Sequence, residues 1–206
     1  MDTRIINTNI DWKTIKNECR TTMNKDGTDI EPTEEFKKKL LISEHSPIRL
    51  GTILFAWDSI KSWIAVHFSR HWLGWGKRIS TQRPDRTGVD RDKAPQDTLV
   101  QMHVDANIQA LINVGKVRLC YQASKETREK MEDLKVTIHN EVDEYVSNVL
   151  VPNCIYRGGC SEFHCCGLYP KFLKWCRKVK NIEDSELFNI QKRYDLYNEW
   201  FYEGRE

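Results

Sequence analysis

Apolar residues recur three or four positions apart along most of the chain, which is the spacing of helices that bury one face. We expect a short helix after Asp11, whose carboxylate can accept hydrogen bonds from the first free backbone amides. A second helix opens near Pro32, which a first helical turn tolerates. It ends before the turn at residues 43–47, because Pro47 moves the residue before it out of the helical region.

The middle of the chain predicts a strand and then a helix. Residues 49–57 are apolar and rich in β-branched and aromatic side chains, which favours a short buried strand. Asp58 or Ser59 then caps a helix that runs through His71 and ends at Gly74.

The second half of the chain predicts helices separated by two loops. A basic loop covers residues 77–95, and the apolar spacing over residues 96–116 predicts one long helix. Shorter helices are expected over residues 125–134 and 141–150, a loop rich in glycine and cysteine over residues 154–167, and helices again towards the C-terminus. We therefore expect an α-rich α/β or α+β fold, a single domain with a small central sheet.

Length and composition exclude several classes of protein. The chain has 206 residues, 39% hydrophobic and 30% charged, and its 32 Lys and Arg nearly balance its 30 Asp and Glu. This excludes a disordered acidic protein and a strongly basic, histone-like DNA binder. No apolar stretch approaches the ~20 residues of a membrane span and no signal peptide is present, so we expect a cytoplasmic protein without a membrane partner. Seven cysteines without an export signal favour reduced thiols or a metal site.

Three cations mark the end of the helix expected before Gly74. His67, Arg70 and His71 are spaced so that they lie on one helical face. Two imidazoles and a guanidinium there can hold a polyanion. The alternative is that these cations only complement the helix dipole.

Polar side chains also share a face of the expected long helix. Asn107 and Arg118 are about three helical turns apart on one face, with Asn113 displaced from it. On a helix that passes over a ligand, each side chain could touch a different part of that ligand. The alternative is an ordinary solvated polar face.

A motif around the three cations resembles the signature of the flavin-dependent thymidylate synthases. Arg70-His71-Trp72, followed by seven residues and Ser80, is similar to the Arg-His-Arg, seven residues, Ser pattern of that family. A single motif of this length is weak, so the rest of the chain has to be compared as well.

Two further segments resemble the same family in the same order. The turn at residues 43–47 is similar to its N-terminal region, and residues 107–118 to its Asn-Ala-Arg-x-Leu, Asn and Leu-Arg segment. The resemblance covers roughly residues 5–150, and ordered motifs are more specific than any one of them. It implies a synthase-like domain over residues 1–150, with residues 151–206 as a Cys-rich loop and a helical extension packed on it.

Carried over by position, the resemblance implies which residues hold each ligand. The implied FAD contacts are Arg70, His71, Asn107 and Asn113. The nucleotide contacts at matched positions are His67, Ser80, Gln82 and Arg118, with Ser80 on the phosphate. Arg83 and Arg91 of the basic loop complete the expected set, Arg91 in place of an arginine that the family takes from a neighbouring subunit. Arg118 is the implied catalytic residue, because a cation beside N3 of the base stabilises the developing anion and makes C5 a better nucleophile.

The resemblance also implies the reaction. NADPH reduces the flavin, 5,10-methylenetetrahydrofolate supplies a one-carbon unit, and the flavin passes on a hydride that completes the methyl group, most simply converting dUMP to dTMP. It further implies a homotetramer with sites at subunit contacts. The scheme needs no enzyme thiol, so Cys120 is more simply a small core residue than a nucleophile.

Departures from the family pattern remove charge from both ligand sites. Trp72 replaces the second arginine of the signature, Gln82 a nucleotide-binding arginine, and Gln109 the arginine of Asn-Ala-Arg. The basic loop offers Arg78, Arg83, Arg86 and Arg91 as replacement cations, which the site needs because an arginine paired with phosphate is a strong contact.

The Cys-rich segment allows three interpretations. Zinc is one, and its ligands would be Cys154, Cys160, His164 and Cys165, although their spacing is not that of a standard zinc knuckle. A lid over the substrate is another, in which Arg157 and the amides of Gly158 and Gly159 meet a phosphate. The third is a set of structural cysteines.

The leading hypothesis is therefore an FAD-dependent enzyme that methylates C5 of a pyrimidine deoxynucleotide, and two alternatives stay open. His67, where the family often has a base-facing glutamine, and Gln82 favour an altered base or product, such as a dCMP methyltransferase or a hydroxymethylase. Six basic residues between positions 77 and 93 favour a non-catalytic nucleotide or nucleic-acid binding module. Three aspartates interrupt that run and the net charge is near zero, which disfavours a nucleic-acid partner.

Overall fold

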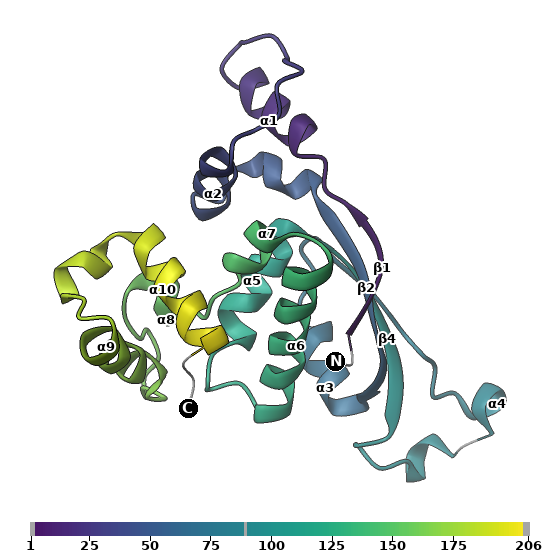
Figure 1. Cartoon of the computed structure of the whole chain (residues 1–206). Helices are drawn as coiled ribbons and strands as arrows, with labels where there is room; N and C mark the ends of the chain where they lie inside the picture. The colour runs from purple at the N-terminus through teal and green to yellow at the C-terminus, as the bar shows by residue number, and fades with distance from the viewer. Residues whose placement is uncertain (1–2, 89, 204–206) are drawn as a thin grey trace. The chain divides into compact units, whose positions relative to one another are not determined.

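The computed structural model describes residues 3–88 and 90–203. Its elements fall into two compact units, which comprise residues 1–31 and 46–110, and residues 32–45 and 111–206. The first unit holds a small sheet, and the second is helical (Figure 1).

The first unit is built on a four-stranded antiparallel sheet with the order β1-β2-β4-β3. Its strands are β1 (Thr3–Asn9), β2 (Thr52–Lys61), β3 (Trp75–Ile79) and β4 (Leu99–Asn107). Its helices are α1 (Trp12–Thr21), the 3-10 helix η1 (Ser46–Leu50), α3 (Ser62–Ser69), the short α4 (Pro84–Thr87), the 3-10 helix η2 (Arg91–Lys93) and the first turn of α5 (Ile108–Arg118).

The expected helix over residues 96–116 is wrong in its first half, which is strand β4. Val100, Met102, Val104 and Ala106 are buried and the residues between them are more exposed, which is the two-residue alternation of a strand. Because the same apolar positions also fit a helix in part, the helical spacing misled the prediction. The helix begins only at Ile108.

The helix after the first buried strand also begins later than predicted. Strand β2 continues to Lys61 across a register shift between Trp57 and Ile60, so α3 starts at Ser62. Asp58 does not cap it, because its carboxylate accepts two hydrogen bonds from Arg4, at 2.7 and 2.8 Å. This guanidinium lowers the pKa of Asp58 from its usual range.

Strand β3 occupies the start of the segment that the sequence predicts as a basic loop. It begins directly after Gly74 and pairs with β4 from Trp75 opposite Ala106 to Ile79 opposite Met102. The strand carries Lys77, so only the part of that segment beyond β3 crosses the surface as short helical turns and loop.

Four aromatic rings fix α3 against the sheet. Trp57 and Phe68 have ring centroids 4.6 Å apart, Phe55 lies edge-on to Trp57 at 5.1 Å, and Trp75 contacts both phenylalanines. All four are buried. Burying one such side chain contributes roughly 1.5–3 kcal/mol, and edge-on ring pairs add to that. The C-terminal end of α3, with its cations, is therefore held firmly beside β3.

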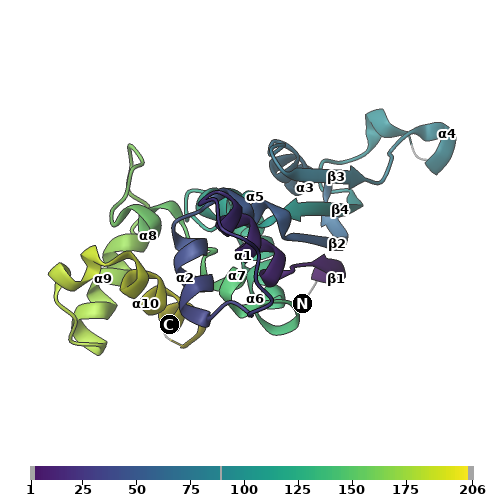
Figure 2. The same ribbon diagram turned by 90° about the horizontal axis from the view of Figure 1, so that it is seen from above.

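The second unit packs helices around an aromatic and aliphatic core (Figures 1 and 2). Its elements are α2 (Glu34–Ile42), the rest of α5, α6 (Lys125–Glu141), α7 (Glu144–Asn148), α8 (Asn153–Arg157), α9 (Leu168–Val179), the 3-10 helix η3 (Asp184–Phe188) and α10 (Ile190–Glu203). The Cys-rich segment thus begins with a short helix, and its loop starts only at Gly158. The proposed division of the chain at residue 150 stays a prediction.

Two buried cations bind backbone carbonyls in this helical unit. Lys135 donates to Ser147 O at 2.6 Å and to the Asn198 side chain at 2.7 Å. Arg193 donates to the carbonyls of Ile155, Leu187 and Tyr156. Buried charges are costly unless fully hydrogen-bonded, so these contacts make the packing of α6, α7, α8 and α10 specific.

The expected fold class, α-rich with a small central sheet, is confirmed. Among the described residues, no helix is both long enough and apolar enough to cross a membrane.

Gly74 and Gly88 provide a matched test of the packing beside β3. Both have positive φ angles, 66° and 68°, which cost another residue about 1–3 kcal/mol. A Cβ at Gly74 would also clash with the Asn107 amide, whereas nothing lies within 4 Å of one at Gly88. We expect Gly74→Ala to lower the free energy of unfolding by about 1–2 kcal/mol more than Gly88→Ala, because it also disturbs a helix cap. Urea denaturation of both variants measures the difference, and equal losses would contradict the clash.

Candidate functional site

The three predicted cations lie at the C-terminal end of α3, but not all on the helix. His67 is in its last turn, Arg70 caps it, and His71 follows it. The His67 ring lies edge-on to Trp63 at 5.4 Å, and the His71 ring edge-on to Trp75 at 6.1 Å. The Arg70 side chain is exposed, and both imidazoles are partly buried. The structure therefore brings the three residues together, with both imidazoles oriented by aromatic neighbours.

Lys77 holds this helix end in place, and sequence reasoning missed it. Its ammonium group donates to the carbonyl of Ser69 and, at 2.8 Å, to that of His71. These carbonyls lie at the C-terminal end of α3, which is the negative end of the helix dipole, and a cation is favourable there. No local pattern marks Lys77 for this role, because the contact depends on β3 lying beside α3.

The surroundings of His71 suit a flavin cofactor in their donor chemistry. Arg70 offers a charged donor and His71 an imidazole N–H, which are donors that a diphosphate can accept from. The buried Trp75 indole N–H has no hydrogen-bond partner, and such groups are rare without a ligand or water. Trp72, which stands in place of the family arginine, is 74% exposed and does not fill this region with its side chain. The residues present therefore fit the cofactor that the sequence resemblance implies.

Ser80 lies at the end of β3 and is held by β4. Its backbone N–H donates to Gln101 O at 2.9 Å, and its Oγ accepts from the Gln101 N–H at 3.0 Å. Because the hydroxyl oxygen already accepts one bond, its hydrogen is left to donate to a ligand. Backbone pairing thus orients this side chain without using its donor.

A cavity beside Ser80 collects residues that the sequence predicts separately. Its volume is about 160 Å³, which is below the roughly 300–1,000 Å³ typical of small-molecule sites, so it has room for only part of a ligand. It is lined by Ser80, Thr81, Gln82, Thr87, Arg91, Ala94, Thr98, Leu99 and Val100. Ser80, Gln82 and Arg91 were each predicted to bind the nucleotide, so the structure brings half of that predicted set into one cavity.

The basic residues around the cavity differ in their partners. Arg83 makes two hydrogen bonds with Asp85, at 2.9 and 3.0 Å, and does not line the cavity. Arg91 lines it, and its nearest carboxylate, Asp92, is 3.9 Å away. Of the four predicted replacement cations, Arg91 is therefore the one that lines the cavity.

Asn107 is not on a helix, contrary to the prediction, because it is the last residue of β4. Its side-chain oxygen accepts from the Ala110 N–H at 2.8 Å and so caps α5. Its backbone N–H donates to Gly74 O at 3.0 Å. The amide nitrogen of the side chain is left to contact a ligand.

Asn113 and Arg118 lie on α5 within the second unit. Asn113 is exposed, and Arg118 is the partly buried last residue of the helix. Between them, Lys116 pairs with Glu44 of the turn after α2 and lies 3.7 Å from the centre of the Tyr156 ring. Because both charges are mostly buried, this pair holds the last turn of α5 in place. Sequence reasoning missed Lys116.

The four proposed zinc ligands do not form a metal site in the structure. His164 lies in the exposed loop, and its backbone carbonyl accepts from Gln122 at 2.6 Å. Cys165 is exposed, Cys160 partly buried and Cys154 buried. Within the described part of the chain, no group of three or more His, Cys, Asp or Glu side chains is placed to hold a metal ion.

The lid interpretation of the same segment is also wrong in its chemistry. The backbone N–H groups of Gly158 and Gly159 both donate to Cys154 O and so close α8. Arg157 donates to the Asn153 side chain at 3.2 Å. The amides that were expected to meet a phosphate are therefore already used.

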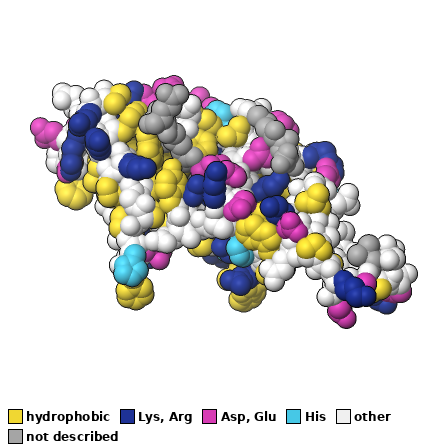
Figure 3. Space-filling view, turned by 90° about the horizontal axis from the view of Figure 1, so that it is seen from below, with side chains coloured by type: hydrophobic (Ala, Val, Ile, Leu, Met, Phe, Trp, Pro, Cys, Tyr) yellow, Lys and Arg dark blue, Asp and Glu magenta, His cyan; other side chains and the backbone are white. Residues whose placement is uncertain are grey.

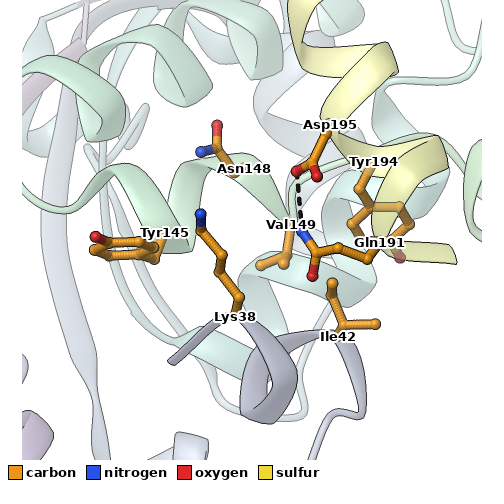
Figure 4. A pocket seen from close by; sticks show the side chains of 8 residues that line it. All are labelled: Lys38, Ile42, Tyr145, Asn148, Val149, Gln191, Tyr194 and Asp195. Carbon is orange, nitrogen blue, oxygen red and sulfur yellow. Dashed lines mark hydrogen bonds between the residues drawn. The ribbon is translucent and has the colours of Figure 1, made fainter. Parts of the chain in front are cut away.

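A second cavity in the helical unit contains no predicted site residue. Lys38 and Ile42 of α2 line it together with Tyr145, Asn148, Val149, Gln191, Tyr194 and Asp195. Figure 4 shows Lys38 on one side and the Gln191–Asp195 hydrogen bond of 2.9 Å on the other. The cavity is narrow, and its lining includes both a cation, Lys38, and an anion, Asp195. It therefore suggests no ligand class.

Charge on the surface is mixed rather than segregated. On the face shown in Figure 3, Lys and Arg side chains alternate with Asp and Glu. In the basic segment, Arg83 pairs with Asp85 and Lys93 with Asp90. A continuous positive surface that would follow a nucleic-acid backbone is therefore not present on that face.

Comparisons with known proteins give structural similarity alone. No protein-family model and no curated protein matches the sequence. Two crystal structures of the UMP/dUMP methylase PolB from Streptomyces cacaoi are similar in fold. The one bound with 5-Br dUMP has a TM-score of 0.57 at 12% identity, over 71% of this chain and 93% of that one. The one bound with 5-Br UMP has a TM-score of 0.55 at 12% identity, over 71% and 92%. The chain shares the fold of these structures, which agrees with the fold class expected from its sequence.

Lys77 and Arg78 are neighbours on β3 and allow a test of the helix cap. We expect Lys77→Met to lower the free energy of unfolding by about 1–2 kcal/mol, because two carbonyls lose a charged donor. Arg78 is exposed, and we expect Arg78→Met to change it by less than about 0.5 kcal/mol. Thermal or urea unfolding measures both changes, and a neutral Lys77→Met would show that the cap contributes nothing.

Proposed function

We propose that this protein transfers a methyl group to C5 of a pyrimidine nucleoside 5′-monophosphate, with FAD, NADPH and 5,10-methylenetetrahydrofolate as its cofactors. One observation carries the proposal: Ser80 and Arg91, both predicted from the sequence as nucleotide contacts, line one cavity. The fold shared with a UMP/dUMP methylase supports it independently. The homotetramer implied by the sequence resemblance is part of the same proposal.

The cavity beside Ser80 would bind the phosphate. The Ser80 hydroxyl hydrogen and the Gln82 amide are neutral donors, and the Arg91 guanidinium is a charged one. A cation matched to a phosphate gives a shorter and stronger hydrogen bond than a neutral donor does. Arg91 would therefore supply the largest part of the binding energy. It would replace the arginine that the family has at the position of Gln82.

The end of α3 would hold FAD. Arg70 and His71 would bind its diphosphate, and the Trp75 indole N–H and the free Asn107 amide nitrogen would donate to polar atoms of the cofactor. When bound, FAD supplies the hydride that completes the methyl group. Lys77 would act indirectly, because it positions the residues at this helix end.

Arg118 would favour the anionic form of the base. A guanidinium beside N3 stabilises negative charge on the ring, and that charge makes C5 the nucleophile towards the one-carbon unit. The Lys116–Glu44 pair keeps the helix turn that carries Arg118 from fraying. Asn113 would line the flavin site from the exposed face of the same helix.

The base and the sugar are decided by assay. Purified protein is incubated with FAD, NADPH, the folate and either dUMP, UMP or dCMP, and the product is identified by mass spectrometry. We expect methylated uridylate from dUMP or UMP. Turnover of dCMP alone, or a hydroxymethyl product, would instead support the alternative that His67 and Gln82 suggest. Inertness towards all three nucleotides, with no uptake of FAD, would refute the proposed function.

Arg91 and Arg83 form a matched pair for the phosphate site. We expect Arg91→Ala to weaken nucleotide binding by about 10–100-fold, because a charge-assisted contact is lost. Arg83 faces Asp85 instead, so we expect Arg83→Ala to change binding by less than about 3-fold. Isothermal calorimetry with the monophosphate measures both, and a larger loss for Arg83→Ala would place the phosphate elsewhere.

Arg118 and His71 separate chemistry from cofactor binding. We expect Arg118→Ala to reduce kcat about 100–1,000-fold while largely sparing FAD affinity, because it removes stabilisation of the reacting ring. We expect His71→Ala to weaken FAD binding first, by about 10-fold. Steady-state rates and flavin absorbance titrations distinguish the two effects, and normal turnover by Arg118→Ala would refute its catalytic role.

A further inference from the structure

Four cysteines from separate segments come near one another in the helical unit. Cys120 follows the end of α5, Cys154 is in α8, and Cys160 and Cys166 flank the tip of the loop between α8 and α9. Figure 2 shows this loop projecting beyond α8. The proposed function uses none of these thiols.

Within this group, Cys120 and Cys166 make direct contact. The two thiols are close enough that Cys166 contributes to raising the pKa of Cys120, and both are partly accessible to solvent. A second contact joins the same two segments, because Gln122 donates to His164 O at 2.6 Å. The loop is therefore tied to the segment after α5 close to the cysteine pair.

We propose that Cys120 and Cys166 are a thiol pair that a small disulfide, such as oxidised glutathione, converts into an intramolecular disulfide. The inference does not depend on the proposed function. It concerns a modification site formed by segments that are 46 residues apart in the sequence.

The exchange balances in two steps. The Cys166 thiolate attacks one sulfur of oxidised glutathione, which forms a mixed disulfide and releases one molecule of glutathione. The Cys120 thiolate then attacks the Cys166 sulfur and releases the second. Two electrons pass from the protein to the oxidant, and the two protons of the cysteines end on the two glutathione thiols.

The Cys120–Cys166 pair differs from the neighbouring Cys154 in solvent accessibility and in thiol ionisation. Burial raises the pKa of Cys154 to about 12, so that thiol is neutral and unreactive at physiological pH. Burial also raises the pKa of Cys120, so little of this thiol is ionised and able to attack first. Once Cys166 carries the mixed disulfide, the adjacent Cys120 has a high effective concentration for the second step.

The test maps disulfides in the full chain after treatment with oxidised glutathione. Remaining thiols are alkylated without reduction, and the protein is digested with trypsin. We expect the peptide of residues 119–125 to be linked to that of residues 158–171, with a loss of two hydrogen atoms. Because the second peptide also holds Cys160 and Cys165, fragment spectra and variants assign the partner.

Matched variants make the assignment decisive. Cys120→Ser and Cys166→Ser should each abolish the link, whereas Cys165→Ser, which removes the adjacent exposed thiol, should retain it. Far-UV circular dichroism confirms that each variant is folded. The oxidised wild-type protein should also melt at a higher temperature than the reduced one, because the link shortens the loops of the unfolded chain. A link from Cys120 to Cys160 or Cys165, or glutathione adducts with no internal link, would overturn the proposal.

Discussion

Strand β4 becomes helix α5 at Asn107 without a loop, and the arrangement of the sheet-bearing unit depends on this junction. The Asn107 and Ile108 amides donate to the carbonyls of Gly74 and Gly51, at 3.0 Å each. The Asn107 side chain meanwhile caps the new helix. Both glycines are required by close approach, since a Cβ at Gly51 would lie 2.5 Å from the Ile108 side chain. The junction thereby joins the starts of β2 and β3 to the first turn of α5.

The same sheet holds the cavity beside Ser80 in place, although arginines expected from the sequence resemblance are missing there. Ser80 is held through its backbone and its acceptor by β4, so its position does not depend on charge. The threonines at the rim mainly hold the loop, because Thr87 donates to Arg83 O and Thr98 to Pro95 O. Among the described residues that line the cavity, Arg91 is the one with a cationic side chain. Under the proposed function, its guanidinium would take the place of the arginines that the sequence resemblance leads us to expect.

In the helical unit, two buried cations connect neighbouring helices by hydrogen bonds. Arg193 gathers three carbonyls from α8 and η3, among them Tyr156 O at 2.7 Å, and so closes helix ends whose last carbonyls lack partners. Lys135 likewise joins α6 to α7 and α10. Each cation meets oxygen dipoles rather than a single carboxylate in these contacts. Replacing either by an apolar residue would leave several buried acceptors unpaired at once, which is costlier than losing one hydrogen bond.

The roles of the site residues stay predictions, whereas several of the elements that carry those residues were predicted wrongly, and the reason is physical. Motif positions such as Ser80 depend on residue identity and order, which survive even when a strand is mistaken for a loop. Strand β4 was missed because Val100 and Met102 alternate in a way that a helix partly accommodates. Lys77 left no local signal at all, since its role depends on carbonyls that only the folded sheet brings within reach. Contacts between segments that are distant in the sequence are therefore the part of a site that a single sequence does not predict. In this protein, such contacts hold the predicted residues in position.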